Sequence, residues 1–272
     1  MGTAASVVGI GYLVIMALLT SFQGRLVYVP STGGGPEPDA VGLSFETVWL
    51  DTDDGERLHG WYLPTSRPTD RTVLFFHGNA GHMSHRLDTL RLLASLQVNV
   101  FIIDYRGYGR STGTPTEPGL ERDAIAAWRY LTQTRGILPQ SIGVHGRSLG
   151  AAVALGLTEA VKPGALIVES GFKSLPDMAA ELYPWLPIRW LARIHYPNLK
   201  RIAKLTSPVL VAHSEHDRLI PFSHGEALFA AAKEPKRFLR MAGGHNGGFM
   251  ATGDTYVQAL RGHLFSNLAS SK

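Results

Sequence analysis

The chain has 272 residues, of which 44% are hydrophobic and only 18% are charged, a balance that excludes a disordered protein and supplies one large core. It contains no cysteine, which excludes disulfides, thiolate zinc sites and a cysteine nucleophile. The formal net charge of +4 is modest, and the Lys and Arg residues form no stripe with interleaved aromatic residues, so we expect no nucleic acid as a partner.

The N-terminal segment is an apolar run without a charged side chain from Met1 to Gln23. As a helix it would extend roughly 30 Å, the hydrocarbon thickness of a bilayer, and we predict a transmembrane anchor over residues 1–24 and a membrane location. A cleaved signal peptide normally has basic residues before its apolar part, and a core helix usually shows polar residues at helical spacing. Both stay open as alternatives. Arg25, which follows the segment, favours a cytoplasmic catalytic domain, but one arginine leaves the side of the membrane open.

After this segment, strand and helix patterns alternate along residues 25–272, which we take as one catalytic domain. Strands separated by helices indicate parallel strands with crossover connections, and continuously apolar strands indicate helices on both faces. The predicted fold class is therefore α/β, with a mostly parallel central sheet and an antiparallel hairpin at one edge. The predicted strands are 45–50, 58–63, 72–76, 98–103, 141–145, 165–168, 208–212 and 237–241, and the predicted helices include 84–96, 117–134 and 149–161.

A candidate nucleophile lies in the run 146–150, where a predicted strand ends and a helix begins. Gly146 and Gly150 flank Ser148 at positions where larger side chains would crowd a sharp bend. Such a bend raises the serine hydroxyl above the carboxyl edge of the sheet and directs it to the positive end of the helix. We therefore predict Ser148 as the nucleophile, and a tight turn with an idle serine is the alternative.

A serine hydroxyl needs a base, which is itself oriented by an acid. For a nucleophile on a strand–turn–helix bend, the expected order along the chain is serine, acid, histidine. Asp217 closely follows the predicted strand 208–212, and His245 follows the last predicted strand within a Gly-rich loop. Both loops lie past strand ends, on the edge where Ser148 is expected to emerge. We predict that the three residues form a catalytic triad.

Other ionisable residues near the strand ends are alternatives for these roles. Glu215 could replace Asp217 as the orienting acid, whereas Glu169 is better explained as a structural or loop-capping carboxylate. Several histidines fit packing, the surface or a loop better than catalysis, and their spacing does not place a metal site on one helix face. We therefore expect neither a metal nor another cofactor. These histidines are His77, His82, His85, His213 and His216.

Acyl transfer also needs an oxyanion hole, which stabilises the negative charge of the transition state. One donor is expected to be the backbone N–H of Leu149, the residue after the nucleophile. The second is expected in the Gly-rich loop 77–81, which follows a predicted strand, through the backbone N–H of Asn79. A plain Gly-rich turn is the alternative reading of this loop.

Together these segments resemble the Bem46-like branch of the α/β-hydrolase superfamily. The resemblance runs from about Val27 to near the C-terminus and includes the preceding apolar segment. It is carried by the runs 75–81, 104–111 and 146–150 and by the segments around Asp217 and His245.

The resemblance implies the α/β-hydrolase fold and hydrolysis of acyl esters or thioesters, in a branch where many members lack an assigned substrate. It places the triad and the oxyanion hole on the residues named above. Ser214 stands where related chains often carry glycine, and this departure does not affect the triad.

The stretch between the strands that end near residue 170 and begin at 208 is rich in aromatic residues and prolines. In this fold an insertion here commonly forms a cap, so we predict a cap insertion over residues 171–206. Its apolar side chains could line an acyl-chain tunnel or enter a membrane interface, and a helix with buried aromatic residues is the alternative. The predicted substrate-binding residues are Tyr183, Trp185, Leu186 and Trp190.

The predicted function is a serine esterase, lipase or acyl-thioesterase that forms an acyl-enzyme. Its expected partners are a small-molecule or lipid ester and a membrane surface. A serine peptidase of the same fold is an alternative, although the sequence shows no propeller domain and no clear acidic pocket for a peptide amino terminus. A catalytically silent scaffold is another alternative, but such a protein normally lacks a member of the triad. The oligomeric state stays open.

Overall fold

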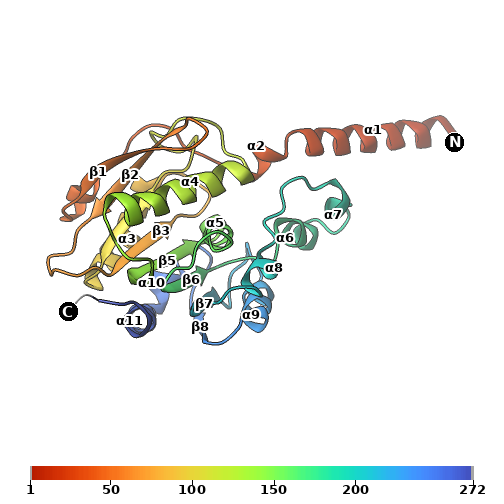
Figure 1. Cartoon of the computed structure of the whole chain (residues 1–272). Coiled ribbons are helices and arrows are strands. Elements are labelled where there is room, and N and C mark those ends of the chain that lie inside the picture. Colours follow the sequence, from red (N-terminus) through yellow and green to blue (C-terminus); the bar gives the residue numbers. More distant parts are fainter. Residues whose placement is uncertain (1, 271–272) are drawn as a thin grey trace.

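The computed structural model describes residues 2–270 and contains one eight-stranded sheet (Figure 1). In chain order the strands are β1 (Glu46–Asp51), β2 (Arg57–Leu63), β3 (Thr72–Phe76), β4 (Asn99–Ile103), β5 (Ile142–Arg147), β6 (Ala165–Glu169), β7 (Val209–Ser214) and β8 (Lys236–Met241). Their spatial order is β1-β2-β4-β3-β5-β6-β7-β8. The hairpin β1–β2 and the pair β2–β4 are antiparallel, and each other neighbouring pair is parallel. The mostly parallel sheet with an antiparallel edge is thus confirmed.

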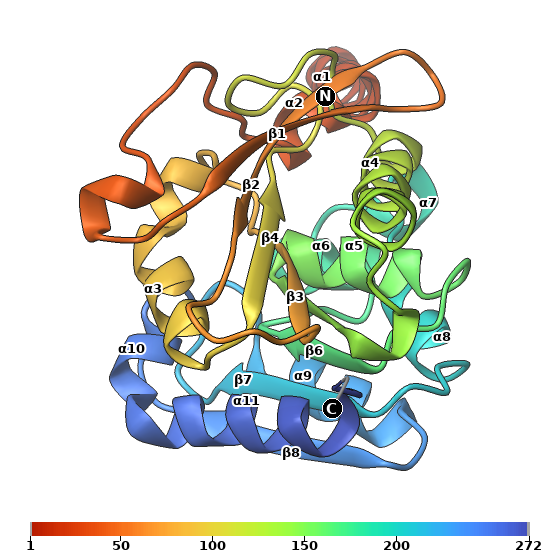
Figure 2. The same ribbon diagram turned by 60° about the vertical axis from the view of Figure 1, so that its left-hand side comes forward.

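Helices cover both faces of this sheet (Figure 2). The helices are α1 (Gly2–Ser21), α2 (Gln23–Val27), η1 (Pro38–Val41), η2 (Met83–Arg86), α3 (Leu87–Ser95), α4 (Glu117–Arg129), η3 (Tyr130–Thr134), η4 (Pro139–Ser141), α5 (Leu149–Leu157), α6 (Leu175–Leu182), α7 (Ile188–Leu191), α8 (Asn198–Ile202), α9 (Phe222–Ala231), α10 (Gly248–Thr252) and α11 (Asp254–Asn267). One face packs against α4, α5 and α9, and the other against α3, α10 and α11, while α8 packs against α5 and α9.

The core consists of two layers because successive strand residues point to opposite faces of the sheet. In β3, Leu74 and Phe76 join the layer beneath α4 and α5, whereas Val73 and Phe75 join the layer beneath α3 and α11. All four side chains are fully buried. This double burial explains why the strands are continuously apolar rather than alternating.

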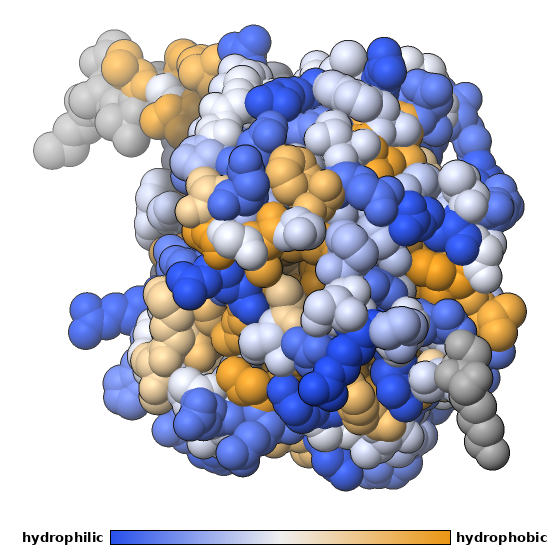
Figure 3. Space-filling model, turned by 90° about the vertical axis from the view of Figure 1, so that its left-hand side faces the viewer, coloured by the Kyte–Doolittle hydropathy of each residue, from blue (hydrophilic) through white to orange (hydrophobic). Residues whose placement is uncertain are grey.

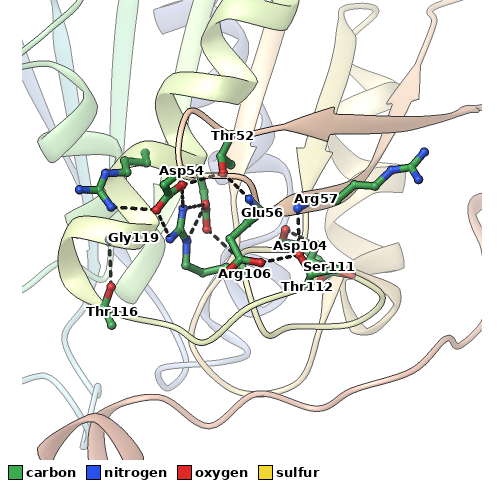
Figure 4. Close-up of polar contacts among 12 residues, drawn as sticks. Thr52, Asp54, Glu56, Arg57, Asp104, Arg106, Ser111, Thr112, Thr116 and Gly119 are labelled. Atoms are coloured by element: carbon green, nitrogen blue, oxygen red, sulfur yellow. Dashed lines mark hydrogen bonds and ion pairs between the residues drawn. The ribbon is translucent and has the colours of Figure 1, made fainter.

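A polar cluster fastens the β1–β2 turn to the loop after β4 and to helix α4 (Figure 4). The guanidinium of Arg106 donates two hydrogen bonds to Asp54, at 2.8 and 2.9 Å, and one to the buried Asp123. These hydrogen bonds, first of all those from Arg106, hold the pKa of Asp54 far below its usual range. The run 104–111, which contributed to the family resemblance, therefore supplies a structural clamp at Arg106.

The N-terminal segment is helical, and α1 projects from the body of the protein (Figure 1). Among the described residues, no helix is long and apolar enough to cross a membrane, so the prediction of a transmembrane helix is not supported. The C-terminal end of the apolar run instead packs against the rest of the protein. Met16 is only 6% exposed, and together with Leu19 and Thr20 it faces a cavity inside the protein. The N-terminal half exposes Val7 and Ile10, and the coloured residues next to the grey N-terminal atoms in Figure 3 are largely hydrophobic.

Candidate active site

Ser148 lies on a strained bend between β5 and α5. Its backbone has φ 57° and ψ −118°, a conformation that non-glycine residues adopt at a cost of about 1–3 kcal/mol and mostly at functional sites. The flanking glycines are required by close backbone approaches. A Cβ on Gly146 would overlap the carbonyl oxygen of Gly150, and a Cβ on Gly150 would overlap that of Phe76. The run 146–150 therefore adopts the sharp bend that its sequence predicts.

The structure brings Ser148, His245 and Asp217 into one hydrogen-bonded chain. His245 Nε2 lies 3.0 Å from Ser148 Oγ, and His245 Nδ1 lies 2.6 Å from Asp217 Oδ2. Because the carboxylate of Asp217 accepts a hydrogen bond from Nδ1–H, the imidazole keeps its proton on Nδ1, and the lone pair of Nε2 is free to accept the serine proton. The arrangement can therefore activate the hydroxyl of Ser148 as a nucleophile.

Asp217 is held by the backbone of its own loop, which follows β7. Its Oδ1 accepts the N–H groups of Leu219 and Ile220, at 2.9 and 2.8 Å. Burial of the carboxyl opposes ionisation, but the hydrogen bonds from His245 and from the two backbone N–H groups outweigh it, so the pKa of Asp217 is lowered. The carboxylate consequently stays charged at neutral pH and can stabilise an imidazolium at His245.

The alternative candidates occupy other environments. Glu215 is exposed and pairs with Arg240, away from the imidazole. His213 is buried and donates to the carbonyl oxygen of Ile220 at 2.9 Å. His82 and His85 form a reciprocal cap at the start of η2. None of these hydrogen bonds leads to Ser148.

A buried charged cluster lies directly beneath the bend and was missed as such by the sequence reasoning. The carboxylate of Glu169 pairs with Arg147 Nε at 2.8 Å and accepts hydrogen bonds from His145 at 2.9 Å and from the hydroxyl of Tyr256 at 2.7 Å. The backbone carbonyl of Glu169 also accepts the N–H of Ser148. Burial opposes ionisation of Glu169, but the guanidinium of Arg147 and the other partners lower its pKa to about 2. The arginine within the run 146–150 was the one sequence signal for this cluster.

The two predicted oxyanion residues lie beside the nucleophile. Leu149 begins α5, so its N–H is among those that have no acceptor within the helix. The loop after β3 passes close by, since a Cβ on Gly78 would come 3.5 Å from the Cβ of Ser148. Asn79, Ser148 and Leu149 line one cavity. The placement is compatible with two backbone donors at the reacting carbonyl.

The cavity at Ser148 has a volume of about 380 Å³, within the range of small-molecule sites. Two of the predicted substrate-binding residues, Tyr183 and Leu186, line it. Trp185 and Trp190 do not line this cavity, and their side chains are 68% and 92% exposed. In the short helix α7, Ile188 and Leu191 share the inward face at a spacing of three, which leaves Trp190 directed outward.

Most of the remaining lining is apolar, and the part that comes from outside the cap was not predicted. It comes from the N-terminal helices, from α6 and the segment before it, from the loop around α7 and from the loop after Asp217. The lining residues in question are Met16, Leu19, Thr20, Gln23, Leu26, Val27, Phe172, Leu175, Pro176, Met178, Ala179, Ile188, Leu191, Ala192, Ile194, Leu219 and Ile220. The sequence signal was the apolar character of these segments, but nothing in it showed that they converge.

Comparison with known proteins identifies the family. Residues 67–200 match a family model described as serine aminopeptidase, S33. The chain is 36% identical to the alpha/beta hydrolase domain-containing protein WAV2 of Arabidopsis thaliana, over 91% of this chain and 90% of that protein. It is 34% identical to the protein bem46 of Schizosaccharomyces pombe, over 94% of this chain and 90% of that protein. The chain therefore belongs to the Bem46-like branch of the α/β-hydrolase superfamily.

A solved structure supports the fold in particular. The esterase Pf2001 of Pyrococcus furiosus superposes with a TM-score of 0.74 and covers 89% of this chain and 100% of its own. The two sequences are only 20% identical. The similarity therefore concerns the α/β-hydrolase architecture and not the substrate.

Proposed function

We propose that this protein is a serine hydrolase that cleaves carboxylic esters or thioesters with an apolar acyl group. The observation that carries the proposal is the hydrogen-bonded chain from Ser148 through His245 to Asp217, which opens onto a cavity with a predominantly apolar lining. In this proposal residues 25–272 form the catalytic domain, with residues 171–206 as its cap.

The proposed reaction has two halves. Ser148 Oγ attacks the acyl carbon while its proton passes to His245 Nε2, and Asp217 stabilises the resulting imidazolium. The backbone N–H groups of Asn79 and Leu149 hold the oxyanion. The alcohol or thiol then leaves with the proton from His245. Water deprotonated by the same imidazole attacks the acyl-enzyme, and the acid is released with Ser148 restored.

A peptidase is the second candidate, because the matching family model is described as serine aminopeptidase. An aminopeptidase must bind the ammonium group of a peptide, for which a carboxylate is the natural partner. None of the described residues that line the cavity is acidic, and most are aliphatic or aromatic. This lining favours an acyl chain over a charged amino terminus.

The first test is the hydrolysis of p-nitrophenyl esters from acetate to palmitate. Each buried methylene contributes about 0.8 kcal/mol, or roughly fourfold in affinity. We therefore expect kcat/KM to rise at least about tenfold between acetate and octanoate. Alanine p-nitroanilide serves as the peptidase substrate and should not be cleaved. A preference for acetate, or cleavage of the anilide above the esters, would contradict the proposal.

We further propose that the substrate is a lipid ester reached at a membrane surface. Trp185 and Trp190 are highly exposed on the cap. Arg189, between them in the sequence, pairs with Asp177 at 3.1 Å and has a side chain that is 65% exposed. Exposed tryptophan next to a basic residue is typical of surfaces that contact the membrane interface. When phosphatidylserine vesicles are sedimented, the wild-type protein should be found in the vesicle pellet, and most of the Trp190→Ala variant should stay in the supernatant. Equal binding of the two proteins would count against this contact.

A further inference from the structure

One face of the N-terminal helices forms a wall of the cavity at Ser148. The side chains of Met16, Leu19, Thr20 and Gln23 line it, at positions i, i+3, i+4 and i+7, which share one helix face. One non-helical residue, Phe22, separates α1 from α2, and its N–H still bonds to the carbonyl of Leu18. The two consecutive helices together border the cavity.

The polar groups on this face are satisfied without water. The hydroxyl of Thr20 donates to the carbonyl of Met16 at 2.8 Å, so the cavity does not have to hydrate it. Both polar atoms of the Gln23 amide form hydrogen bonds with the backbone. Nε2 donates to the carbonyl of Leu191 at 2.6 Å, and Oε1 accepts the N–H of Arg193 at 2.8 Å. Gln23 thereby joins the N-terminal helices to the backbone of the cap.

A second amide joins the same segment to the loop of the oxyanion hole. Asn79 Oδ1 accepts the N–H of Val29 at 3.0 Å, and its Nδ2 donates to the carbonyl of Val27. The hydroxyl of Tyr108 adds a hydrogen bond to the same Oδ1 at 2.7 Å. The segment 23–29 is thus attached to the cap at one end and to the nucleophile region at the other.

We propose that this face of α1 and α2, which we call the N-terminal wall (Met16, Leu19, Thr20, Gln23, Leu26 and Val27), determines the length of the acyl chain that the enzyme accepts. Gln23 is its positioning residue, because it fixes the wall against the cap. The proposal rests on the ester hydrolysis proposed above. It follows from the structure because the cavity lies between wall, cap and Ser148, so a chain attached to Ser148 must extend along the wall.

The test compares two tryptophan substitutions on the same helix. Leu19→Trp fills the cavity, whereas Ile10→Trp changes a side chain that is 62% exposed and does not line the cavity. The readout is the ratio of kcat/KM for p-nitrophenyl octanoate to that for the acetate, measured with the full-length protein. At roughly fourfold for each methylene, the loss of two methylene positions lowers this ratio by more than about tenfold. We expect Leu19→Trp to lower the ratio at least about tenfold and Ile10→Trp to leave both rates unchanged.

Gln23→Leu tests the attachment of the wall. Leucine is similar in size to glutamine, but it cannot form the hydrogen bonds with Leu191 and Arg193. The ratio should fall towards one, while Ser148 still reacts with a fluorophosphonate probe, which shows that the site is folded. If Leu19→Trp and Gln23→Leu label normally and keep the wild-type ratio, the wall has no role in selectivity and the inference is wrong. If the wild type hydrolyses no ester at all, the proposed function fails instead.

Discussion

Replacing Ser148 with alanine is expected to abolish ester hydrolysis while the protein stays folded. Loss of the nucleophile of a serine triad lowers kcat by about 10⁶-fold, because the attacking oxygen is removed while the imidazole and the oxyanion donors remain. The bend should persist, because alanine at position 148 has a Cβ like serine and therefore adopts the positive φ of this bend at a similar cost. The measurement is hydrolysis of p-nitrophenyl octanoate, together with labelling by a fluorophosphonate probe.

Ser95→Ala is the matched control for this substitution. Ser95 is exposed at the end of α3 and donates to the carbonyl of Leu92, far from the cavity lining. Its variant should label and hydrolyse esters as the wild type does. If Ser148→Ala kept more than about a tenth of the wild-type rate, the nucleophile would have to be another residue and the proposed mechanism would be wrong.

Glu169→Gln is expected to cause a large loss of stability. The neutral amide would leave the buried guanidinium of Arg147 without its counter-charge, and breaking one side of a buried ion pair costs about 3–5 kcal/mol. The backbone of Glu169 supports the N–H of Ser148, so labelling of Ser148 should also slow. Urea denaturation of the full-length protein, followed by circular dichroism, measures the change.

Acid denaturation gives a second readout of Glu169. Its pKa falls from 4.5 to about 2 on folding, so the folded state binds this proton less tightly than the unfolded state. The stability that Glu169 contributes is therefore present above pH 4.5 and is lost as the pH falls towards 2. Glu169→Gln should flatten the pH dependence of stability in this window.

Glu215→Gln is the control for the charge change. Glu215 pairs with Arg240 on the surface, and exposed pairs contribute only about 0–1 kcal/mol. The variant should keep both stability and activity. A large loss of activity would instead support the alternative that Glu215 orients the imidazole, and an equal effect of both substitutions on stability would show that burial of Glu169 is unimportant.

Local features of the sequence were sufficient to predict the bend at Ser148. The glycines two residues away on each side, the preceding apolar strand and the following Ala-rich helix are all short-range patterns. The order of serine, acid and histidine then selected Asp217 and His245, because loops after parallel strands emerge at one edge of a sheet. The catalytic role of the three residues stays a prediction until the variants are measured.

The backbone partners of the Asn79 side chain could not be predicted, because they lie 50 and 52 positions away in the chain. Its amide bonds Val27 and Val29, and no local pattern reports a contact at that separation. The hydrogen bond from Gln23 to the carbonyl of Leu191 also joins residues that are distant in the sequence, so no local pattern predicts it. For Trp190, the aromatic composition indicates a cap but does not specify which side of the four-residue helix α7 faces inward.

Local sequence patterns were sufficient to predict the sheet, its antiparallel edge and the bend that carries Ser148, because alternation, apolar runs and glycine requirements act over a few residues. The environment of the C-terminal part of the apolar N-terminal helix, by contrast, depends on contacts between distant segments and is visible only in the folded protein. An apolar helix face loses water equally well in lipid or against protein, so hydropathy alone cannot distinguish the two. The contacts of Met16, Leu19 and Gln23 at the cavity decide in favour of protein for that part of the segment.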